Sequence, residues 1–304
     1  MNKIYVLGSI NMDMVIKTPY MPKNGETLTG SDFLLNSGGK GANQAVAASK
    51  QDVLVNLIAS VGNDVFGNDL IKTLSNYNVD VTYIDKLEDT STGVAMIIIE
   101  NKDNRIILDG GANRKISNEQ IDKALVAAKE NDIFITQLEN NIDAVLYGLK
   151  KAKEKGMITI FNPAPAIKLE NEFYSYVDYL IVNETECEIL TAIDPVTLED
   201  KKKAYKALCD LGVKNLIITL GSKGSICFAG SEVIEVKANK VDAIDTTAAG
   251  DTFVGTLASK LINNASLKEA LDYASICSSL TCLKNGAQQS IPTLKEVTEY
   301  LKNR

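Results

Sequence analysis

Apolar runs and amphipathic segments alternate along most of this chain. Residues 4–10 and 54–61 are largely apolar, which is typical of strands buried on both faces of a sheet. Repeated units of a strand followed by a helix favour a parallel sheet with right-handed crossovers. The pattern predicts an α/β fold with helices flanking a mostly parallel central sheet. Further strands are expected at 133–136, 158–161, 179–182 and 216–220, with helices at 66–74, 121–128, 142–155, 198–211, 252–262, 267–283 and 294–301.

Local signals at helix starts support these boundaries. A hydroxyl residue followed three positions later by Glu or Gln forms a capping box, in which each residue satisfies a free backbone amide of the first turn. Three pairs have this spacing: Ser117 with Gln120, Ser266 with Glu269, and Thr293 with Glu296.

Two segments depart from the alternation. No helical period holds between residues 14 and 36, where prolines and glycines divide the chain into short pieces. Residues 93–99 and 105–108 are predicted to pair as a hairpin with its turn at 101–104. We therefore expect one domain, residues 1–304, with a small β-sheet lid contributed by about 12–36 and 92–110.

The lid has an apolar face. Val94, Met96 and Ile98 alternate along one side of a sheet that is too small to bury them alone. We therefore expect the lid to cover a ligand and also to form the contact of a homodimer.

Composition narrows the function. A chain of 304 residues with 45% apolar side chains can bury a large core, and its net charge of -7 without a basic cluster argues against nucleic acid or an anionic membrane as a partner. No apolar run reaches membrane-spanning length and no targeting pattern opens the chain, so we expect a cytoplasmic protein. The five scattered cysteines fit reduced core thiols.

The chain contains no histidine. This excludes histidine-based catalytic triads, imidazole proton shuttles and histidine-ligated metal centres. Any acid or base chemistry must use carboxylates or lysines.

Residues 245–255, DTTAAGDTFVG, lead from a loop of small residues into an apolar helix. The amides of Ala248, Ala249 and Gly250 would have no partner within that helix, and small side chains allow a phosphate oxygen to approach them. Asp251 follows at once. Because a carboxylate does not attract phosphate, we interpret Asp251 as the base that deprotonates an attacking hydroxyl. The alternative is an ordinary acid favoured by the helix dipole.

A second unusual segment, SGGKGANQ at 37–44, favours the catalytic interpretation. Its glycines let the backbone pack against a small polar molecule, and Asn43 faces that molecule from the first helical turn. The segment is not a Walker loop, because glycine follows Lys40 and the GxxxxGK spacing is absent; Gln44 also replaces the last glycine of GxGxxG. Lys40 itself is either a ligand-binding group or an ordinary surface lysine.

Polar side chains also lie just past predicted strands. Asn11 and Asp13, two residues apart, should point to the same side, and Glu139 follows the strand at 133–136. Taken singly, each fits a turn or a solvated acid. In a chain with a phosphate-binding loop, they predict a ligand site at the carboxyl edge of the sheet.

Several segments together resemble the ribokinase-type (PfkB) carbohydrate kinase family. Each is weak alone, but their order along nearly the whole chain makes a chance match very improbable. The resemblance implies a ribokinase-like αβα sandwich with a β-sheet lid, and ATP-dependent phosphorylation of D-ribose at its 5-hydroxyl. The segments are GSINMD (8–13), GGKGANQA (38–45), STGVA (91–95), QLE (137–139), NPAPA (162–166), NETE (183–186), ITLGSKG (218–224), DTTAAGDTF (245–253) and KNGAQQSIP (284–292).

The resemblance assigns roles to individual residues. Asp251 would be the general base, and the amides of Ala248, Ala249 and Gly250 the anion hole for the γ-phosphate. Asn183 and Glu186 match an NxxE element that supports Mg²⁺ through water. Sugar hydroxyls would be bound by Asn11, Asp13, Gly39, Lys40, Asn43, Glu139 and Asp251. The nucleotide site would be lined by Thr219, Gly221, Ser222, Gly224 and Ser275.

The resemblance also implies an activating potassium ion beside the anion hole. Oxygen-only ligation suits such a hard monovalent cation. The corresponding groups are Asp245, the carbonyls of Thr247, Thr281 and Gly286, and Ser290.

These roles fit a chain without histidine, because phosphoryl transfer depends mainly on placement and charge neutralisation. Two rival functions remain. A related kinase would act on deoxyribose, fructose, a keto-sugar acid or a nucleoside. A catalytically silent sugar-binding protein could use the same fold, although the presence of Asp251, Asn183 and Glu186 argues against it.

Overall fold

A large, mostly parallel sheet forms the centre of the molecule. The computed structural model describes residues 1–100 and 103–303. The strands of this sheet are β1 (Ile4–Leu7), β4 (Val55–Gly62), β5 (Ile84–Leu87), β8 (Ile133–Thr136), β9 (Ile158–Phe161), β10 (Tyr179–Asn183), β11 (Asn215–Thr219), β12 (Ser225–Ala229) and β13 (Glu232–Val236). Their order is β13-β12-β11-β10-β9-β8-β1-β4-β5. The strands from β11 to β5 run parallel, whereas β12 and β13 add antiparallel to one edge.

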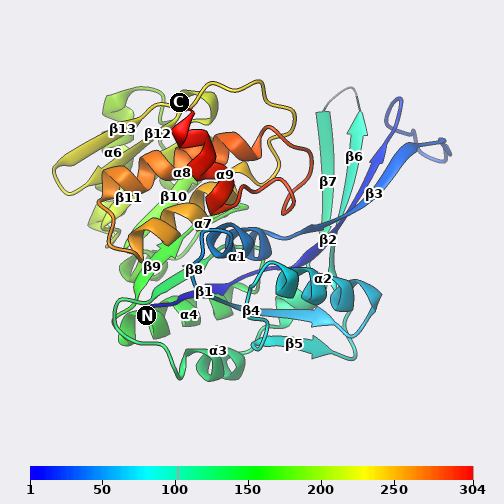
Figure 1. Cartoon of the computed structure of the whole chain (residues 1–304), viewed down its shortest axis with the longest axis horizontal. Helices are drawn as coiled ribbons and strands as arrows, with labels where there is room; N and C mark the ends of the chain where they lie inside the picture. Colours follow the sequence, from blue (N-terminus) through cyan, green and yellow to red (C-terminus); the bar gives the residue numbers. More distant parts are fainter. Residues whose placement is uncertain (101–102, 304) are drawn as a thin grey trace.

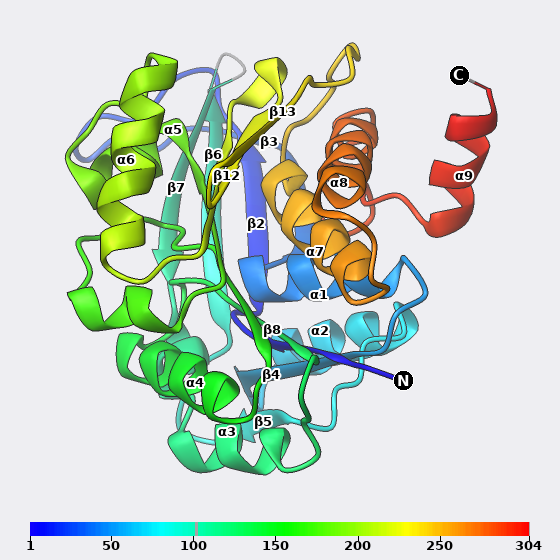
Figure 2. The ribbon, with the colours of Figure 1, turned by 90° about the vertical axis from the view of Figure 1, so that its left-hand side faces the viewer.

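Helices cover both faces of this sheet, as Figure 2 shows. One layer contains α1 (Lys40–Ser49), α2 (Val65–Asn76), α7 (Ala249–Leu261) and α8 (Leu267–Thr281), with α9 (Leu294–Lys302) outside α8. The other layer contains α3 (Asn118–Leu125), α4 (Ile142–Glu154), α5 (Glu184–Thr191) and α6 (Leu198–Asp210).

The first strand shows why the sheet needs both layers. Ile4 and Val6 belong to the core shared with α1 and α7, and Tyr5 and Leu7 belong to the core shared with α3 and α4. All four side chains are at most 1% exposed. Each such side chain contributes about 1.5–3 kcal/mol through burial, so a strand apolar on both faces requires helices on both sides.

A second, four-stranded sheet extends away from the main body (Figure 1). It contains β2 (Asn11–Lys17), β3 (Ser31–Gly38), β6 (Gly93–Glu100) and β7 (Asp103–Asp109), in the order β3-β2-β6-β7. The β6–β7 pair is antiparallel, as predicted for the hairpin, the β2–β3 pair is antiparallel as well, and β2 runs parallel to β6. Of the predicted turn at 101–104, residues 101 and 102 lie outside the described residues.

The lid sheet exposes large apolar side chains. Met96 is 40% exposed, whereas Val94 and Ile98 are half-buried. The exposed apolar residues are not confined to the predicted strand at 93–99 but also lie on β3 and β7. They are Phe33, Leu34, Leu35, Met96, Ile106 and Ile107.

The fold predicted from the apolar pattern is confirmed, with local differences. Strands β5, β12 and β13 and helix α5 were not expected, because they are short and their apolar periods cover only two or three positions. Asn11 and Asp13 do not close the first strand but begin β2 of the lid. None of the helices in the described part of the chain combines the length and apolar composition of a membrane span.

Two of the three predicted capping boxes are confirmed, those of Ser266 and Thr293. At α3, Ser117 accepts a hydrogen bond from the Gln120 amide, but the Gln120 side chain does not return it. It is buried and donates instead to the carbonyls of Ala59 and Tyr83, which ties α3 to the sheet. The cysteines also differ from expectation, since Cys209 is exposed on α6.

Candidate active site

Part of the predicted site lies where the carboxyl ends of the parallel strands face the N-termini of α1 and α7. A pocket of about 240 Å³ opens there, bounded by the ends of β10 and β11. Its lining includes seven of the predicted residues, Lys40, Asn183, Glu186, Thr219, Ala248, Gly250 and Asp251, together with Asn162, Ala164, Ile181, Val182, Thr246 and Val254.

Asp251 lies in the first turn of α7 and is only 8% exposed. Its Oδ2 accepts a hydrogen bond from Asn43 Nδ2 at 2.9 Å, and its Oδ1 accepts one from Gln44 Nε2 at 3.0 Å. Burial raises the pKa of Asp251, against the opposing effects of the Lys40 charge and the two amide hydrogen bonds. The site therefore holds a buried carboxylate whose basicity exceeds that of an ordinary aspartate.

Glu139 connects three segments of the site. Its Oε2 accepts hydrogen bonds from Ser9 Oγ at 2.6 Å, Asn11 Nδ2 at 3.2 Å and the Lys40 amide at 3.1 Å. These donors come from the loop after β1, the start of β2 and the first residue of α1. One carboxylate thus links Asn11 and Lys40, two of the other predicted sugar-binding residues.

Asp13 lies deeper in the lid than its position after a strand had indicated. Among the described residues, no donor forms a hydrogen bond with its carboxylate. Burial, followed by the charges of Glu139 and Asp251, raises the pKa of Asp13 to about 7. An acceptor group held without a donor is suited to receive hydroxyl groups of a ligand.

Lys40 provides the positive charge among these acids. Burial alone would lower the pKa of its ammonium group, but the charges of Asp251, Glu139 and Glu186 raise it. The half-buried Lys40 is therefore cationic and lines the pocket. Its amide is also part of the site, so both its backbone and its side chain face the acids.

The start of α7 presents free amides, although not the three that were predicted. Ala248 has a left-handed conformation with φ of 60°, and no side chain caps the helix. The Ala249 amide donates to the Thr246 carbonyl at 3.2 Å. Within the described chain, the amides of Ala248, Gly250 and Asp251 have no acceptor, so the available anion-binding group includes Asp251 in place of Ala249.

Asn183 and Glu186 form a capping box at the start of α5. Asn183 Oδ1 accepts from the Glu186 amide at 2.8 Å, and Glu186 Oε2 accepts from the Asn183 amide at 2.9 Å. Burial raises the pKa of Glu186, with the Asp251 charge adding to it and Lys40 opposing it. The spacing thus has a local structural cause, and both residues still line the pocket.

The predicted nucleotide residues are spread over three elements, β11, the 3-10 turn after it and α8. Thr219 ends β11 and lines the pocket, and its hydroxyl donates to the Val182 carbonyl at 3.2 Å. Gly221 and Ser222 form the following 3-10 turn (Gly221–Lys223), and Gly224 ends it. Ser275 is buried in α8, where its hydroxyl donates to the Lys237 carbonyl at 3.4 Å.

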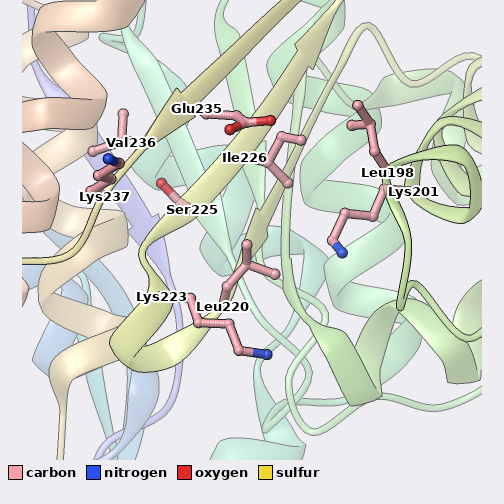
Figure 3. Close-up of a pocket in the computed structure, with 9 residues that line it drawn as sticks. All are labelled: Leu198, Lys201, Leu220, Lys223, Ser225, Ile226, Glu235, Val236 and Lys237. Atoms are coloured by element: carbon pink, nitrogen blue, oxygen red, sulfur yellow. The ribbon is translucent and has the colours of Figure 1, made fainter.

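A further cavity of about 160 Å³ lies beside that turn and includes Lys223. Figure 3 shows Leu198 and Lys201 of the α6 segment on one side and strands β12 and β13 on the other. Lys201 is 8% exposed, and its ammonium donates to the Val196 carbonyl at 2.9 Å. No residue of the predicted site belongs to its lining.

The residues predicted to hold potassium belong to segments that the structure links. Asp245 accepts hydrogen bonds from the Thr247 amide at 2.9 Å and from the Gly286 amide at 2.8 Å. Although burial alone would raise it, these bonds and the Thr247 hydroxyl lower the pKa of Asp245. Thr281 and Ser290, which lie close to Gly286 in the sequence, are both fully buried. The oxygen-rich donor set with an ionised carboxylate fits a hard cation.

Four buried amide side chains belong to the site that the sequence did not reveal. Asn113 donates to Asn11 Oδ1 at 2.7 Å and accepts from the Ile10 amide at 2.9 Å, which fixes the start of the lid. The others, Gln44, Gln137 and Asn162, lie behind Asp251. Gln137 and Asn162 directly follow β8 and β9, and the predicted Glu139 lies two residues after Gln137, so their positions carried a signal.

Comparison with known proteins identifies the family. The model of the pfkB family of carbohydrate kinases matches residues 1–294. The chain is 42% identical to the ribokinase of Schizosaccharomyces pombe, over 98% of this chain and 97% of that one. It is 36% identical to a deoxyribokinase of Salmonella typhi, over 98% of both chains.

Solved structures agree with these relatives. The structure of Arabidopsis thaliana ribokinase complexed with ribose and ATP has a TM-score of 0.93 and 30% identity, covering 99% of both chains. That of Thermotoga maritima ribokinase has a TM-score of 0.90 and 35% identity, covering 100% of both. The chain belongs to the pfkB family of carbohydrate kinases and is an ATP-binding sugar kinase of that type.

Proposed function

We propose that the protein phosphorylates D-ribose at the 5-hydroxyl with ATP. The observation that carries this proposal is the position of Asp251, whose buried carboxylate lies directly beside free helix amides and contacts Asn43 at 2.9 Å. A hydroxyl placed there faces a base and an anion-binding group together. The ribokinases among the relatives support ribose as the sugar.

The lid and the first loop would bind the sugar. Asn11 and Asp13 lie on the same face of β2, two residues apart, and Glu139 and Lys40 complete the set of acceptors and donors. Neighbouring hydroxyls of a pentose can reach such paired groups at once. Gly39 is buried at the start of α1, where a ligand can approach the backbone closely.

In the proposed reaction, Asp251 accepts the proton of the 5-hydroxyl as its oxygen attacks the γ-phosphorus. The new oxygen–phosphorus bond forms while the bond to the ADP oxygen breaks, and the proton stays on Asp251 until product release. The amides of Ala248 and Gly250 donate to the developing negative charge of the transferred group. Lys40, which also lines the pocket, adds a cation.

Metal ions would support this chemistry. Glu186 is the acidic group of the pocket suited to hold Mg²⁺ through water, and Mg²⁺ neutralises phosphate charge when bound. Asp245, the carbonyls of Thr247, Thr281 and Gly286, and Ser290 would hold K⁺. The hydrogen bond from Gly286 to Asp245 brings the two halves of that set together.

We also propose that the exposed apolar face of the lid pairs with a second copy of the chain. Met96 and Ile107 pair across β6 and β7 on one face and are 40% and 66% exposed, which leaves neighbouring apolar groups on that face in water. Ile107→Lys should convert a dimer to a monomer in sedimentation velocity. An unchanged sedimentation coefficient at equal concentration would refute the lid contact.

A second candidate substrate is 2-deoxyribose, because a deoxyribokinase is as similar to the chain as several ribokinases. The test compares D-ribose and 2-deoxy-D-ribose in a coupled ADP assay, with the phosphorylated position read by NMR. A hydrogen bond to the 2-hydroxyl from a charged group should favour ribose about 10- to 100-fold in kcat/KM. A preference for deoxyribose would assign the second substrate, and no turnover of any sugar would refute the proposed activity.

A further inference from the structure

A chain of buried side-chain amides runs behind Asp251. Gln44 Nε2 donates to Asp251 Oδ1 at 3.0 Å and to Asn162 Oδ1 at 3.1 Å. Gln44 Oε1 accepts from Gln137 Nε2 at 2.7 Å, and Asn162 Nδ2 donates to the Ile181 carbonyl at 2.9 Å. Gln44 and Gln137 are fully buried, and Asn162 is 9% exposed. The chain therefore ties the ends of β8, β9 and β10 to α1 and α7.

The direction of this chain is fixed at one end. The Ile181 carbonyl can only accept a hydrogen bond, so the amide nitrogen of Asn162 must face it. Asn162 then presents its oxygen to Gln44, which must turn its own nitrogen toward Asn162 and Asp251. The oxygen of Gln44 consequently faces Gln137.

The other end of the chain fixes nothing. Gln137 Oε1 is buried and has no hydrogen-bond partner among the described residues. The side-chain amide of Gln137 could therefore be turned to match whichever atom Gln44 presents. No hydrogen bond other than the one to Gln44 would be affected. The orientation of Gln44 depends on Asn162 and the Ile181 carbonyl, and not on Gln137.

This polarity matters for a base. Asp251 receives a donor on each oxygen, Gln44 on Oδ1 and Asn43 on Oδ2. Two N–H donors favour the ionised carboxylate, because a protonated oxygen would face a donor instead of an acceptor. A reversed Gln44 would present its oxygen and favour the protonated acid, which cannot accept the proton of the sugar.

We infer that Gln44 is a positioning residue that keeps Asp251 ionised and oriented, and that Asn162 sets the direction in which Gln44 points. This inference rests on the proposed role of Asp251 as the base. It concerns residues that do not themselves touch the reacting atoms.

The charges around Asp251 make these donors necessary. Lys40 at the start of α1 favours the ionised form, whereas Glu139 after β8, Asp13 on β2 and Glu186 on α5 oppose it. Burial opposes it as well, and the pKa of Asp251 is raised as a result. With one cation against three acids, the hydrogen bonds that Asn43 and Gln44 donate to Asp251 add to the effect of Lys40 in favouring the ionised base.

The experiment compares pH profiles of kcat for the wild-type protein and three variants. Gln44→Met removes the donor at similar size, and its acid limb should move up by roughly one to two pH units, with a roughly 10- to 100-fold loss of kcat at pH values below the wild-type limb. The KM for ribose should change little. Asn162→Leu should shift the limb in the same direction, because Gln44 then loses its fixed orientation.

Gln137→Met is the matched control. It removes the side-chain amide of Gln137, which hydrogen-bonds to Gln44 but does not set the orientation of Gln44. The acid limb of this variant should therefore stay at the wild-type pH, whatever the effect on kcat. A purely structural role would instead lower kcat in all three variants without moving any limb. An unshifted limb in Gln44→Met, or an equal shift in Gln137→Met and Asn162→Leu, would overturn the inference.

A second variant guards against failure of Gln44→Met to fold. Gln44→Glu keeps the shape but places a second carboxyl group against Asp251, so one of the pair must carry a proton and the acid limb should again move up. An unshifted limb in this variant would equally overturn the inference. Failure of the proposed function itself is separate, because the wild-type protein would then not phosphorylate any sugar.

Discussion

The raised pKa of Asp13 offers a test of the electrostatics of the site. The pKa of Asp13 is raised from 3.8 to about 7 by burial and by Glu139 and Asp251. A shift of about three units corresponds to roughly 4 kcal/mol, and water in the open site reduces it, so we expect about 2–4 kcal/mol. The empty protein carries this cost when Asp13 is ionised. Asp13→Asn should therefore stabilise the ligand-free protein at pH 8.

The sign of the pH dependence follows from the raised pKa. Between pH 3.8 and about 7 the folded protein binds more protons at Asp13 than the unfolded chain, so wild-type stability falls as pH rises through this window. The free-energy cost of ionising Asp13 in the folded protein is complete above pH 7. It disappears below the ordinary pKa of 3.8, which applies to the unfolded chain. The advantage of Asp13→Asn should accordingly be largest at pH 8 and fall to less than half by pH 5.

Urea unfolding followed by circular dichroism at pH 5, 6, 7 and 8 measures this difference. Asp69→Asn, on the exposed face of α2, is the matched control and should show no such pH-dependent gain. A variant that is less stable than wild type at pH 8, or a gain that does not change with pH, would refute the reasoning. Asp13→Asn should also bind ribose more weakly than the wild-type protein, because it loses a charged acceptor.

Three further predictions concern the packing of α7 against α1, a buried ion pair and the monovalent cation. Gly255→Ala should cost about 1–3 kcal/mol and lower turnover, because a Cβ there would lie 2.4 Å from the Gln44 carbonyl oxygen; equal stability in urea would contradict this. Asp178→Asn should cost about 1–3 kcal/mol at pH 7, because hydrogen bonds from Lys153, Lys214 and Thr159 lower the pKa of this carboxyl although burial alone would raise it. The difference should shrink as pH falls below 4 toward the lowered pKa, and a pH-independent difference would exclude the ionic cause. Replacing Na⁺ by K⁺ should raise kcat, and equal rates in the two salts would remove K⁺ from the mechanism.

The sequence predicted which segments meet, because parallel strands bring their carboxyl ends to one edge. Asn43 and Asp251, far apart in the chain, lie in hydrogen-bond contact because their helices, α1 and α7, pack against each other on one face of the sheet. Glu139 was found by the same rule. The rule was less useful for Asp13, since a short turn after β1 carries the chain into the lid before that residue.

What the sequence did not predict depends on side-chain direction. Gln44 was noted only as the residue that breaks a dinucleotide motif, yet its amide contacts Asp251 and Asn162. Whether a polar side chain on a helix faces a neighbour or water is decided by packing between distant segments. The capping box of Asn183 and Glu186, in contrast, is local and had the recognisable spacing.

The central claim, that Asp251 is the base, is tested most directly by Asp251→Asn. The substitution keeps the size of the side chain and removes its ability to accept a proton. We expect kcat for ribose phosphorylation to fall roughly 10²- to 10⁴-fold, while calorimetry shows ribose and ATP binding close to wild type. Turnover close to that of the wild-type protein would contradict the claim.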